Sequence, residues 1–278
     1  MTELVRPRSL EEALATRAAH PDWMVMAGCT DLMVNANHRA APPGILDLWR
    51  VPGLGGISTS TTGVTIGAGT TWLEVQRDPA IAKHWAPLAA CAREIGALQI
   101  QARATLGGNV GTSSPVGDSL PVLLALDAEL ELASVRGRRR VPYREYCTGY
   151  RKTLLAADEL IVAAHLPLPG PRTRTTWKKV GTRRAQSISK VMGSAAIEFD
   201  GGVVVSARVA LGAVADRPIR VTAVEHAVRG LPPAKAADAA RAALHGAIKP
   251  IDDVRSNARY RLAVAENLVA RFFTDLVP

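Results

Sequence analysis

Residues 105–127 have the sequence Thr-Leu-Gly-Gly-Asn-Val-Gly-Thr-Ser-Ser-Pro-Val-Gly-Asp-Ser-Leu-Pro-Val-Leu-Leu-Ala-Leu-Asp, which combines glycines with small polar residues. Gly107 and Gly108 carry no Cβ, so the backbone can turn sharply there and bring its N–H groups close to a ligand. The polar groups beside them suit ribose, ribityl and phosphate oxygens, and they belong to Thr105, Asn109, Thr112, Ser113, Ser114 and Asp118. From Ser119 the sequence becomes apolar, which predicts a helix that starts beside the loop. We interpret residues 105–118 as a ligand-binding loop, with a plain connection between two packed elements as the alternative.

A second loop of small residues follows a short apolar segment near the N-terminus. Residues 23–34 read Trp-Met-Val-Met-Ala-Gly-Cys-Thr-Asp-Leu-Met-Val, which predicts a buried strand that ends at Gly28. The backbone at such a strand end has unpaired N–H groups and often binds ligands. Two loops of this kind in one chain favour a single pyrophosphate that is held from two sides.

Together these segments resemble the FAD-binding medium subunit of the molybdenum hydroxylases. The resemblance rests on Ala-Gly-Cys-Thr-Asp-Leu at 27–32, Ile-Gly-Ala-Gly-Thr-Thr at 66–71, and Thr-Leu-Gly-Gly-Asn and Ser-Pro-Val-Gly-Asp within 105–118. It continues through residues 149–161 and 177–191 and so covers nearly the whole chain. The family includes bacterial dehydrogenases of xanthine, carbon monoxide, nicotine and aromatic heterocycles, and the middle region of animal xanthine dehydrogenase.

The resemblance implies an α+β fold in three parts. A two-part FAD-binding domain of the PCMH type, similar to vanillyl-alcohol oxidase, would be followed by a small α/β C-terminal domain with an antiparallel three-stranded sheet and helices. The expected boundaries are 1–56 for the N-terminal FAD-binding subdomain, 57–170 for the central one and 171–278 for the C-terminal domain.

Hydrophobic periodicity and turn signals predict the individual elements. Ser9 and Glu12 form a capping box for a first helix, and Leu160–Leu166 is apolar enough to be the central strand of its sheet. The dense basic run 136–140 reads as a hairpin turn. The remaining expected strands are 23–27, 45–48, 64–68, 129–135, 195–199 and 203–211, and the remaining expected helices are 72–77, 87–95, 121–126, an alanine-rich helix that ends at 245 and a final amphipathic helix around 262–272.

The resemblance also implies a set of cofactor-binding residues. These are Met26, Ala27, Gly28, Cys29, Thr30, Asp31, Leu32, Thr105, Gly107, Gly108, Asn109, Thr112, Ser114, Asp118, Ile161 and Lys179. Residues 28–32 and 105–109 would grip the pyrophosphate, largely through backbone N–H groups. Asp118 would accept ribityl or ribose hydroxyls, and Ile161 and Lys179 would contact the flavin ring, with Lys179 as the charge partner of the reduced ring. The residues alone leave other roles open, because Asp118 also fits a helix cap and Ile161 also fits a core.

At three positions the chain departs from the family pattern, one of them Ser187, which replaces an acidic residue that is common after the arginine pair 183–184. Cys29 stands where bacterial relatives have a second glycine, which argues against a conformation that glycine alone adopts. Ile95 falls where animal relatives place an aromatic ring against the flavin, so ring stacking is not expected there.

Composition narrows the function classes. The 47% hydrophobic and 21% charged content of this 278-residue chain is that of a soluble globular protein. The net charge of +9 raises nucleic-acid binding as an alternative, but an aromatic content of 4% leaves few platforms for stacking bases. The three cysteines and six histidines are scattered, so we expect no metal site in this chain.

Motifs for other enzyme classes are missing from the sequence. It contains no Walker loop, nucleophile elbow or His-Glu-x-x-His, and its short glycine motifs at 53–56 and 67–69 lack the third glycine of a dinucleotide fingerprint. No apolar run approaches the roughly 20 residues of a membrane span, and the N-terminus lacks a signal pattern, so the expected location is the cytoplasm.

The expected function is electron transfer within a molybdenum-containing hydroxylase. FAD on this chain would take electrons from the [2Fe-2S] clusters of a small partner subunit and pass them to an acceptor such as NAD, a quinone or O2. A large partner subunit would carry molybdopterin and the hydroxylation chemistry, in a dimer of heterotrimers, so no catalytic residue is expected here. A purine or another N-heterocycle is the expected substrate; the alternatives are a carbon monoxide or aldehyde dehydrogenase medium subunit, a free-standing flavoprotein oxidase, and a scaffold subunit without flavin.

Overall fold

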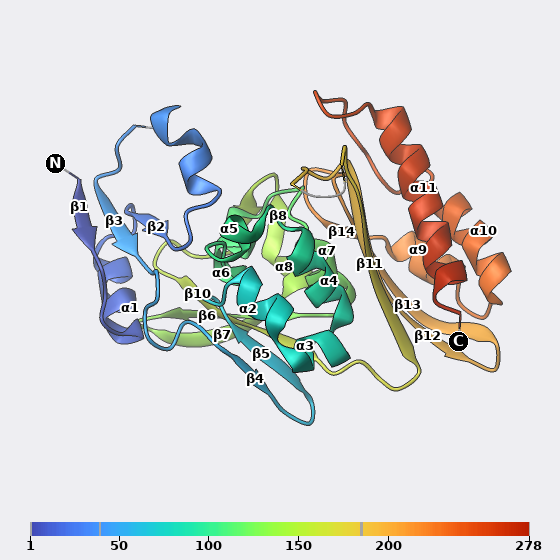
Figure 1. Ribbon diagram of the computed structural model, residues 1–278, viewed down its shortest axis with the longest axis horizontal. Helices are drawn as coiled ribbons and strands as arrows, with labels where there is room; N and C mark the ends of the chain where they lie inside the picture. Colours follow the sequence, from blue (N-terminus) through green and yellow to red (C-terminus); the bar gives the residue numbers. More distant parts are fainter. Residues whose placement is uncertain (1, 39, 184–185, 278) are drawn as a thin grey trace.

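Three β-sheets organise the computed structural model, which describes residues 2–38, 40–183 and 186–277 (Figure 1). The N-terminal part holds a parallel sheet with the strand order β1-β3-β2. Its elements are β1 (Glu3–Val5), α1 (Leu10–Ala19), β2 (Met24–Met26), the 3₁₀ helix η1 (Leu32–His38) and β3 (Gly44–Asp47). Ser9 caps α1 by accepting the Glu12 N–H, whereas the Glu12 carboxylate accepts the N–H of Arg8. In the predicted capping box, the Glu12 carboxylate would accept the N–H of Ser9; in the structure it accepts the N–H of the preceding residue.

The central part is an antiparallel five-stranded sheet with helices on one face. Its strand order is β4-β5-β10-β6-β7, so β10 (Leu160–Pro167) occupies the predicted central position. The other strands are β4 (Ile57–Thr59), β5 (Gly63–Gly67), β6 (Glu129–Ser134) and β7 (Gly137–Pro142), with β8 (Cys147–Gly149) and β9 (Lys152–Thr153) as a separate pair. The helices are α2 (Trp72–Arg77), α3 (Pro79–His84), α4 (Ala86–Glu94), α5 (Leu98–Gln101), α6 (Leu106–Thr112), α7 (Leu120–Ala125) and α8 (Tyr143–Tyr146).

The C-terminal part is an antiparallel sheet with helices on its outer face (Figure 1). It contains β11 (Thr173–Val180), β12 (Val191–Asp200), β13 (Val203–Gly212), β14 (Ile219–Arg220), α9 (Thr222–Ala227), α10 (Pro233–Leu244) and α11 (Ala258–Asp275). The prediction of three strands misses β14, which is only two residues long and leaves no periodic signal.

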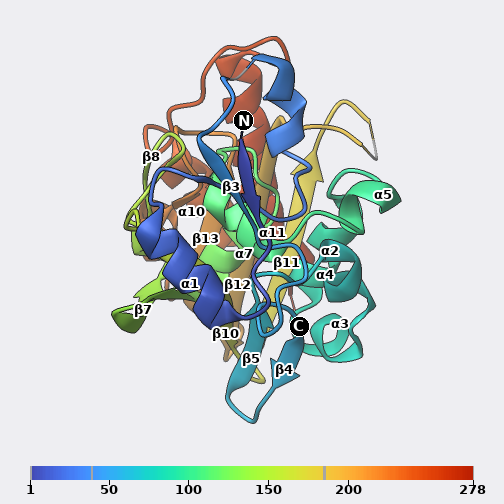
Figure 2. The same cartoon turned by 90° about the vertical axis from the view of Figure 1, so that its left-hand side faces the viewer.

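Two shared cores join these parts. Apolar side chains of the central helices pack with Trp177, Ala196 and Ala210 from the C-terminal sheet in one continuous cluster. On the other face of the central sheet, Leu160 and Val162 pack with residues of α1 and β3. Figure 2 shows the N-terminal part from the front, with α1 lying across the central sheet. The central part is therefore held between its two neighbours, and the clefts along its edges are fixed by packing.

Two local predictions differ from the structure. Residues 106–112, expected as part of a glycine loop, form helix α6, because Thr105 caps it and its first N–H groups find acceptors. The arginines of the run 136–140 lie mainly in β7, with the turn at its start. Each of Arg138, Arg139 and Arg140 pairs with a carboxylate of the neighbouring chain segments, which explains why a basic run extends as a strand here.

Candidate functional site

A cleft of about 1680 Å³ runs along the junction of the three parts. It is lined by every residue of the predicted cofactor site except Asp118 and Lys179. The structure thus brings together Met26, Ala27, Gly28, Cys29, Thr30, Asp31, Leu32, Thr105, Gly107, Gly108, Asn109, Thr112, Ser114 and Ile161. Residues about 80 positions apart in sequence, such as Gly28 and Gly108, meet because the N-terminal sheet and α6 face each other across this space.

The loop at 28–31 presents free backbone donors to the cleft. The N–H groups of these four residues donate to no backbone acceptor in the described part of the chain. Cys29 has a φ of 64°, and an N–H sequence that passes through such a left-handed residue forms a concave nest for an anion. A Cβ on Gly28 would lie 1.8 Å from the carbonyl oxygen of Arg103, so only glycine allows this loop to pack against the segment that leads into α6.

The thiol of Cys29 is partly buried and hydrogen-bonded within its own loop. Burial, and secondly the charge of Asp47, raise its pKa above the ordinary value, and its Sγ donates to the carbonyl oxygen of Ala27 at 3.3 Å. A low-pKa thiolate is the form that reacts readily, so the structure assigns Cys29 a backbone role. The replacement of the relatives' glycine by cysteine argued against a left-handed conformation at this position. Cys29 nevertheless adopts that conformation, at a steric cost of about 1–2 kcal/mol.

The first backbone N–H groups of α6 are already hydrogen-bonded to acceptors within the protein. The N–H of Leu106 donates to Thr70, that of Gly107 to Ala68, and that of Gly108 to the hydroxyl of Thr105 at 3.0 Å. The expected role of residues 105–109 in holding the pyrophosphate stays a prediction, since in this structure these three N–H groups already have acceptors. What α6 offers to the cleft is polar side chains and the bare backbone of Gly107, where a Cβ would lie 2.7 Å from that of Ala68.

Asp118 and Lys179 form a buried ion pair and do not line the cleft. Lys179 Nζ is 2.6 Å from Asp118 Oδ2, and the two side chains are 4% and 10% exposed respectively. The hydroxyl of Ser189 donates to Asp118 Oδ1 at 2.5 Å, and Lys179 also donates to the carbonyl oxygen of Glu94. Burial raises the pKa of Asp118, and the hydrogen bonds from Lys179 and Ser189 oppose that rise. The pair joins the central part to the C-terminal part, and sequence reasoning gave no sign of Ser189.

The cleft wall contains buried donors that the protein leaves without an acceptor. They are Nε of Arg17, Nε1 of Trp72 and Nε of Arg261, and none of them has a partner in the described ranges. Buried polar groups are nearly always hydrogen-bonded, so unsatisfied donors in a cavity wall fit a site that receives its acceptors from a ligand. Together with the free N–H groups at 28–31, they suit an anionic ligand rich in oxygen, as FAD is.

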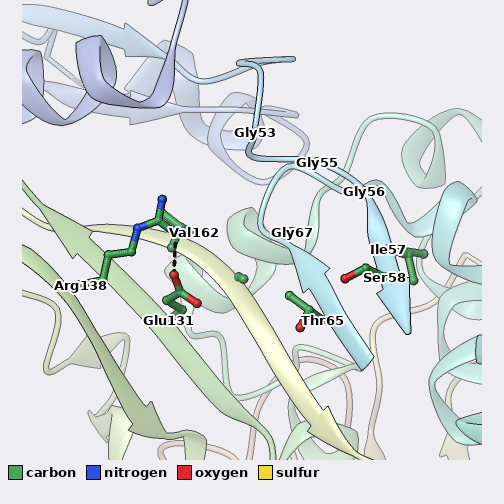
Figure 3. Close-up of a pocket in the computed structure, with 11 residues that line it drawn as sticks. Gly53, Gly55, Gly56, Ile57, Ser58, Thr65, Gly67, Glu131, Arg138 and Val162 are labelled. Carbon is green, nitrogen blue, oxygen red and sulfur yellow. Dashed lines mark hydrogen bonds and ion pairs between the residues drawn. The ribbon is translucent and has the colours of Figure 1, made fainter. Parts of the chain in front are cut away.

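A second, smaller pocket of about 310 Å³ lies on the other face of the central sheet (Figure 3). Glycines at 53–56 form one side, and the Arg138–Glu131 ion pair, at 2.7 Å, forms the other. His165 bridges the second Glu131 oxygen and the hydroxyl of Thr65, at 2.8 Å each. Every polar side chain in this network has a protein partner.

The chain belongs to the FAD-binding flavoprotein subunits of the molybdenum hydroxylases, a family of oxidoreductases whose cofactor on this subunit is FAD. Residues 1–169 match the FAD binding domain in molybdopterin dehydrogenase, and residues 177–276 match the CO dehydrogenase flavoprotein C-terminal domain. The resemblance seen at 27–32, 66–71 and 105–118, and the fold that it implied, are thereby confirmed.

Similar proteins match the chain along almost its full length. The glyceraldehyde dehydrogenase medium chain of Sulfolobus acidocaldarius is 32% identical and covers 98% of this chain and 97% of its own length. The nicotine 6-hydroxylase medium subunit of Paenarthrobacter nicotinovorans is 30% identical over 97% of this chain and 95% of its own. A subunit of carbon monoxide dehydrogenase from Hydrogenophaga pseudoflava superposes with a TM-score of 0.92 at 29% identity, over 97% of this chain and 95% of its own.

Among the described side chains, no group of three or more His, Cys, Asp or Glu is arranged to hold a metal ion. No helix within the described ranges has both the length and the apolar character required to cross a bilayer.

Proposed function

We propose that this chain binds FAD in the large cleft and relays electrons within a multi-subunit molybdenum hydroxylase. The observation that carries the proposal is the cleft itself. In the described part of the chain, its N–H groups at 28–31 and the buried side-chain donors of Arg17, Trp72 and Arg261 have no hydrogen-bond acceptor. FAD supplies reversible acceptance and release of electrons when bound. A small subunit with [2Fe-2S] clusters delivers the electrons, and a large subunit with molybdopterin oxidises the substrate.

The residues of this chain perform binding and electrostatic tuning. The nest at 28–31 holds the pyrophosphate, with Thr112 and Ser114 as further polar contacts to the same ligand. Ile161 and Ile95 supply an apolar wall for the ring. Lys179 is a buried cation that donates to the carbonyl oxygen of Glu94, the residue before Ile95, and a cation near the ring would stabilise negative charge that develops on reduction.

Asp118 fixes this cation in place. Because its carboxylate already accepts from Lys179 and Ser189, we assign Asp118 first to orienting Lys179 and second to the ribityl hydroxyls. The site comprises residues from all three predicted units, 1–56, 57–170 and 171–278, so we propose that the units act as one binding body.

In this proposal, the substrate of the complex is a purine or another N-heterocycle, and its electron acceptor is NAD, a quinone or O2. The complex is a dimer of heterotrimers in the cytoplasm. Medium chains of aldehyde, nicotine and carbon monoxide dehydrogenases are similar to this chain at 30–32% identity, so a carbon monoxide or aldehyde dehydrogenase is the second candidate. A free-standing oxidase is disfavoured, because the similar medium chains match from end to end.

The visible absorption spectrum of the natively purified protein tests the proposal, together with identification of the released cofactor and a count of co-purifying chains, iron and molybdenum. FAD with two further subunits, iron and molybdenum is the expected result. FAD on a lone chain that oxidises a substrate would instead establish the oxidase, and a preparation that takes up no flavin would reject the site.

A further inference from the structure

The N-terminal end of the cleft contains an arginine that neither the predicted site nor the family resemblance assigns. Arg17, on α1, lines the cleft beside Trp23, Val25 and Leu160. Its Nη1 donates to the carbonyl oxygen of Trp23 at 3.0 Å, which fixes the guanidinium on the cleft wall. Its Nε is buried and has no acceptor in the described part of the chain.

This guanidinium is a partly buried cation whose hydrogen-bonding capacity is incompletely used. Burial lowers the pKa of Arg17 and the charge of Asp22 raises it, but arginine remains protonated throughout the physiological range. A buried N–H without an acceptor is unfavourable by itself. The arrangement becomes favourable when a ligand places an oxygen or a ring nitrogen beside Nε.

The surroundings of Arg17 indicate which part of a ligand would lie there. Trp23 immediately precedes the strand β2 and Gly28 comes two residues after its end, so the Arg17 anchor and the anion nest lie at the two ends of the segment 23–28, which spans at most about 17 Å. Trp23 is 7% exposed, stacked on His20 and packed against Gly44, so it gives this end of the cleft a rigid wall, and Val25 adds an apolar side chain to it. An arginine beside an aromatic and apolar slot suits a purine nucleotide.

We propose that Arg17 binds the adenosine monophosphate half of FAD and selects the dinucleotide FAD over the mononucleotide FMN. Nε donates to an acceptor on that half, while the nest at 28–31 holds the pyrophosphate and the ring lies towards Ile95 and Ile161 in the central part. The inference rests on the proposed function, because it assumes that the cleft is a flavin site. FMN lacks the adenosine half and therefore does not reach Arg17.

The test compares two flavins on variants of the full chain in the assembly in which it purifies, after removal of bound flavin. Titration with FAD and with FMN, followed by flavin fluorescence, gives a Kd for each. Arg17→Gln should weaken FAD binding about ten- to hundredfold, the range for loss of a charged hydrogen bond, and leave the Kd of FMN unchanged. Arg17→Lys, which keeps the charge but not the planar donor fork, should fall between Arg17→Gln and the unaltered chain.

Arg144→Gln is the matched control, since Arg144 lies on α8 with its side chain 63% exposed, and it should alter neither Kd. Equal weakening of FAD and FMN by Arg17→Gln would overturn the inference and assign Arg17 to the fold. An unchanged Kd for FAD would overturn it as well. Failure of the unaltered chain to bind either flavin would instead reject the proposed function.

Discussion

The large cleft and the small pocket differ in how the protein uses the polar groups that line them. In the small pocket, Arg138, Glu131, His165 and Thr65 form a closed chain of hydrogen bonds (Figure 3). In the large cleft, backbone N–H groups and buried side-chain donors have no acceptor within the described part of the chain. Both hollows lie against the same central sheet and both contain glycines and charges. The difference lies in the side chains: those of the small pocket satisfy one another, whereas three residues that line the large cleft have buried donors that the protein leaves without an acceptor.

The largest difference between the two regions should be in how much each charged pair contributes to the free energy of unfolding. Lys179→Met removes the cation from a pair that is almost fully buried, and we expect a loss of about 3–5 kcal/mol in the free energy of unfolding. Arg138→Gln removes the cation from a pair whose arginine is 57% exposed, and we expect at most about 1 kcal/mol. Urea denaturation of both variants, followed by circular dichroism, measures the difference.

The double variant Asp118→Leu with Lys179→Met sharpens this result. If the loss comes from an uncompensated buried carboxylate, removal of that carboxylate should recover part of the stability. Equal losses for Lys179→Met and Arg138→Gln would show that the two regions do not differ in electrostatic burial.

The next largest difference should be in the effect of replacing a glycine of each region by alanine. Gly28→Ala places a Cβ 1.8 Å from the carbonyl oxygen of Arg103, so the two chain segments must separate. We expect a loss of about 1–3 kcal/mol in stability and loss of FAD occupancy from the purified protein. Gly55→Ala, in the small pocket, meets nothing within 4 Å and should change neither quantity. Full FAD occupancy in Gly28→Ala would remove the 28–31 loop from the proposed site.

The acids of the two regions should respond to pH with opposite sign. Burial raises the pKa of Asp118 above its ordinary 3.8, so its contribution to stability is fully present below that value and is lost as the pH rises through the folded-state pKa. Glu131 is also partly buried, but hydrogen bonds from Arg138 and His165 give it a lowered pKa. Its contribution is present above the ordinary 4.5 and is lost as the pH falls through the folded-state pKa.

Unfolding free energies of Asp118→Asn and Glu131→Gln across the acidic to neutral range measure these contributions by difference from the unaltered chain. The difference for Asp118 should decrease with rising pH, and that for Glu131 should increase. The same sign for both would mean that hydrogen bonding, and not burial, controls Asp118.

Local pattern was enough to predict most elements, and the family resemblance implied most residues that line the cleft, but neither showed how the donors there are used. The apolar run Leu160–Leu166 identified the central strand because only a strand covered on both faces can be apolar throughout. The glycines at 107 and 108 resembled a ligand loop, yet their N–H groups are taken by acceptors at 68 and 105. Such acceptors come from elsewhere in the fold, and no local pattern reports them.

The two residues missed at the site, Ser189 and Arg17, show the same limit. Ser189 reaches Asp118 across 71 positions, and Arg17 on an ordinary amphipathic helix becomes part of the cleft wall only once α1 packs on the central sheet. The Asp118–Lys179 pair was predicted as two separate contacts to the cofactor, because the sequence does not show that a loop and a strand place them against each other.

The smallest expected effect concerns the backbone at Cys29, where the nest depends on a left-handed residue. Because Cys29 has a φ of 64°, Cys29→Gly relieves a steric cost of about 1–2 kcal/mol in the folded state. The glycine also increases the conformational entropy of the unfolded chain, which lowers stability by about 0.5–1 kcal/mol. The net change in the free energy of unfolding should therefore stay within about 1 kcal/mol, and FAD binding should persist. Cys29→Val places a β-branched side chain in the same conformation and should destabilise the loop by about 1–3 kcal/mol, with weaker FAD binding. Thermal denaturation and FAD titration of both variants separate the two cases. If Cys29→Val binds FAD like the unaltered chain, the concave backbone at 28–31 is not what holds the ligand, and the contrast between the cleft and the small pocket then depends on the side-chain donors alone.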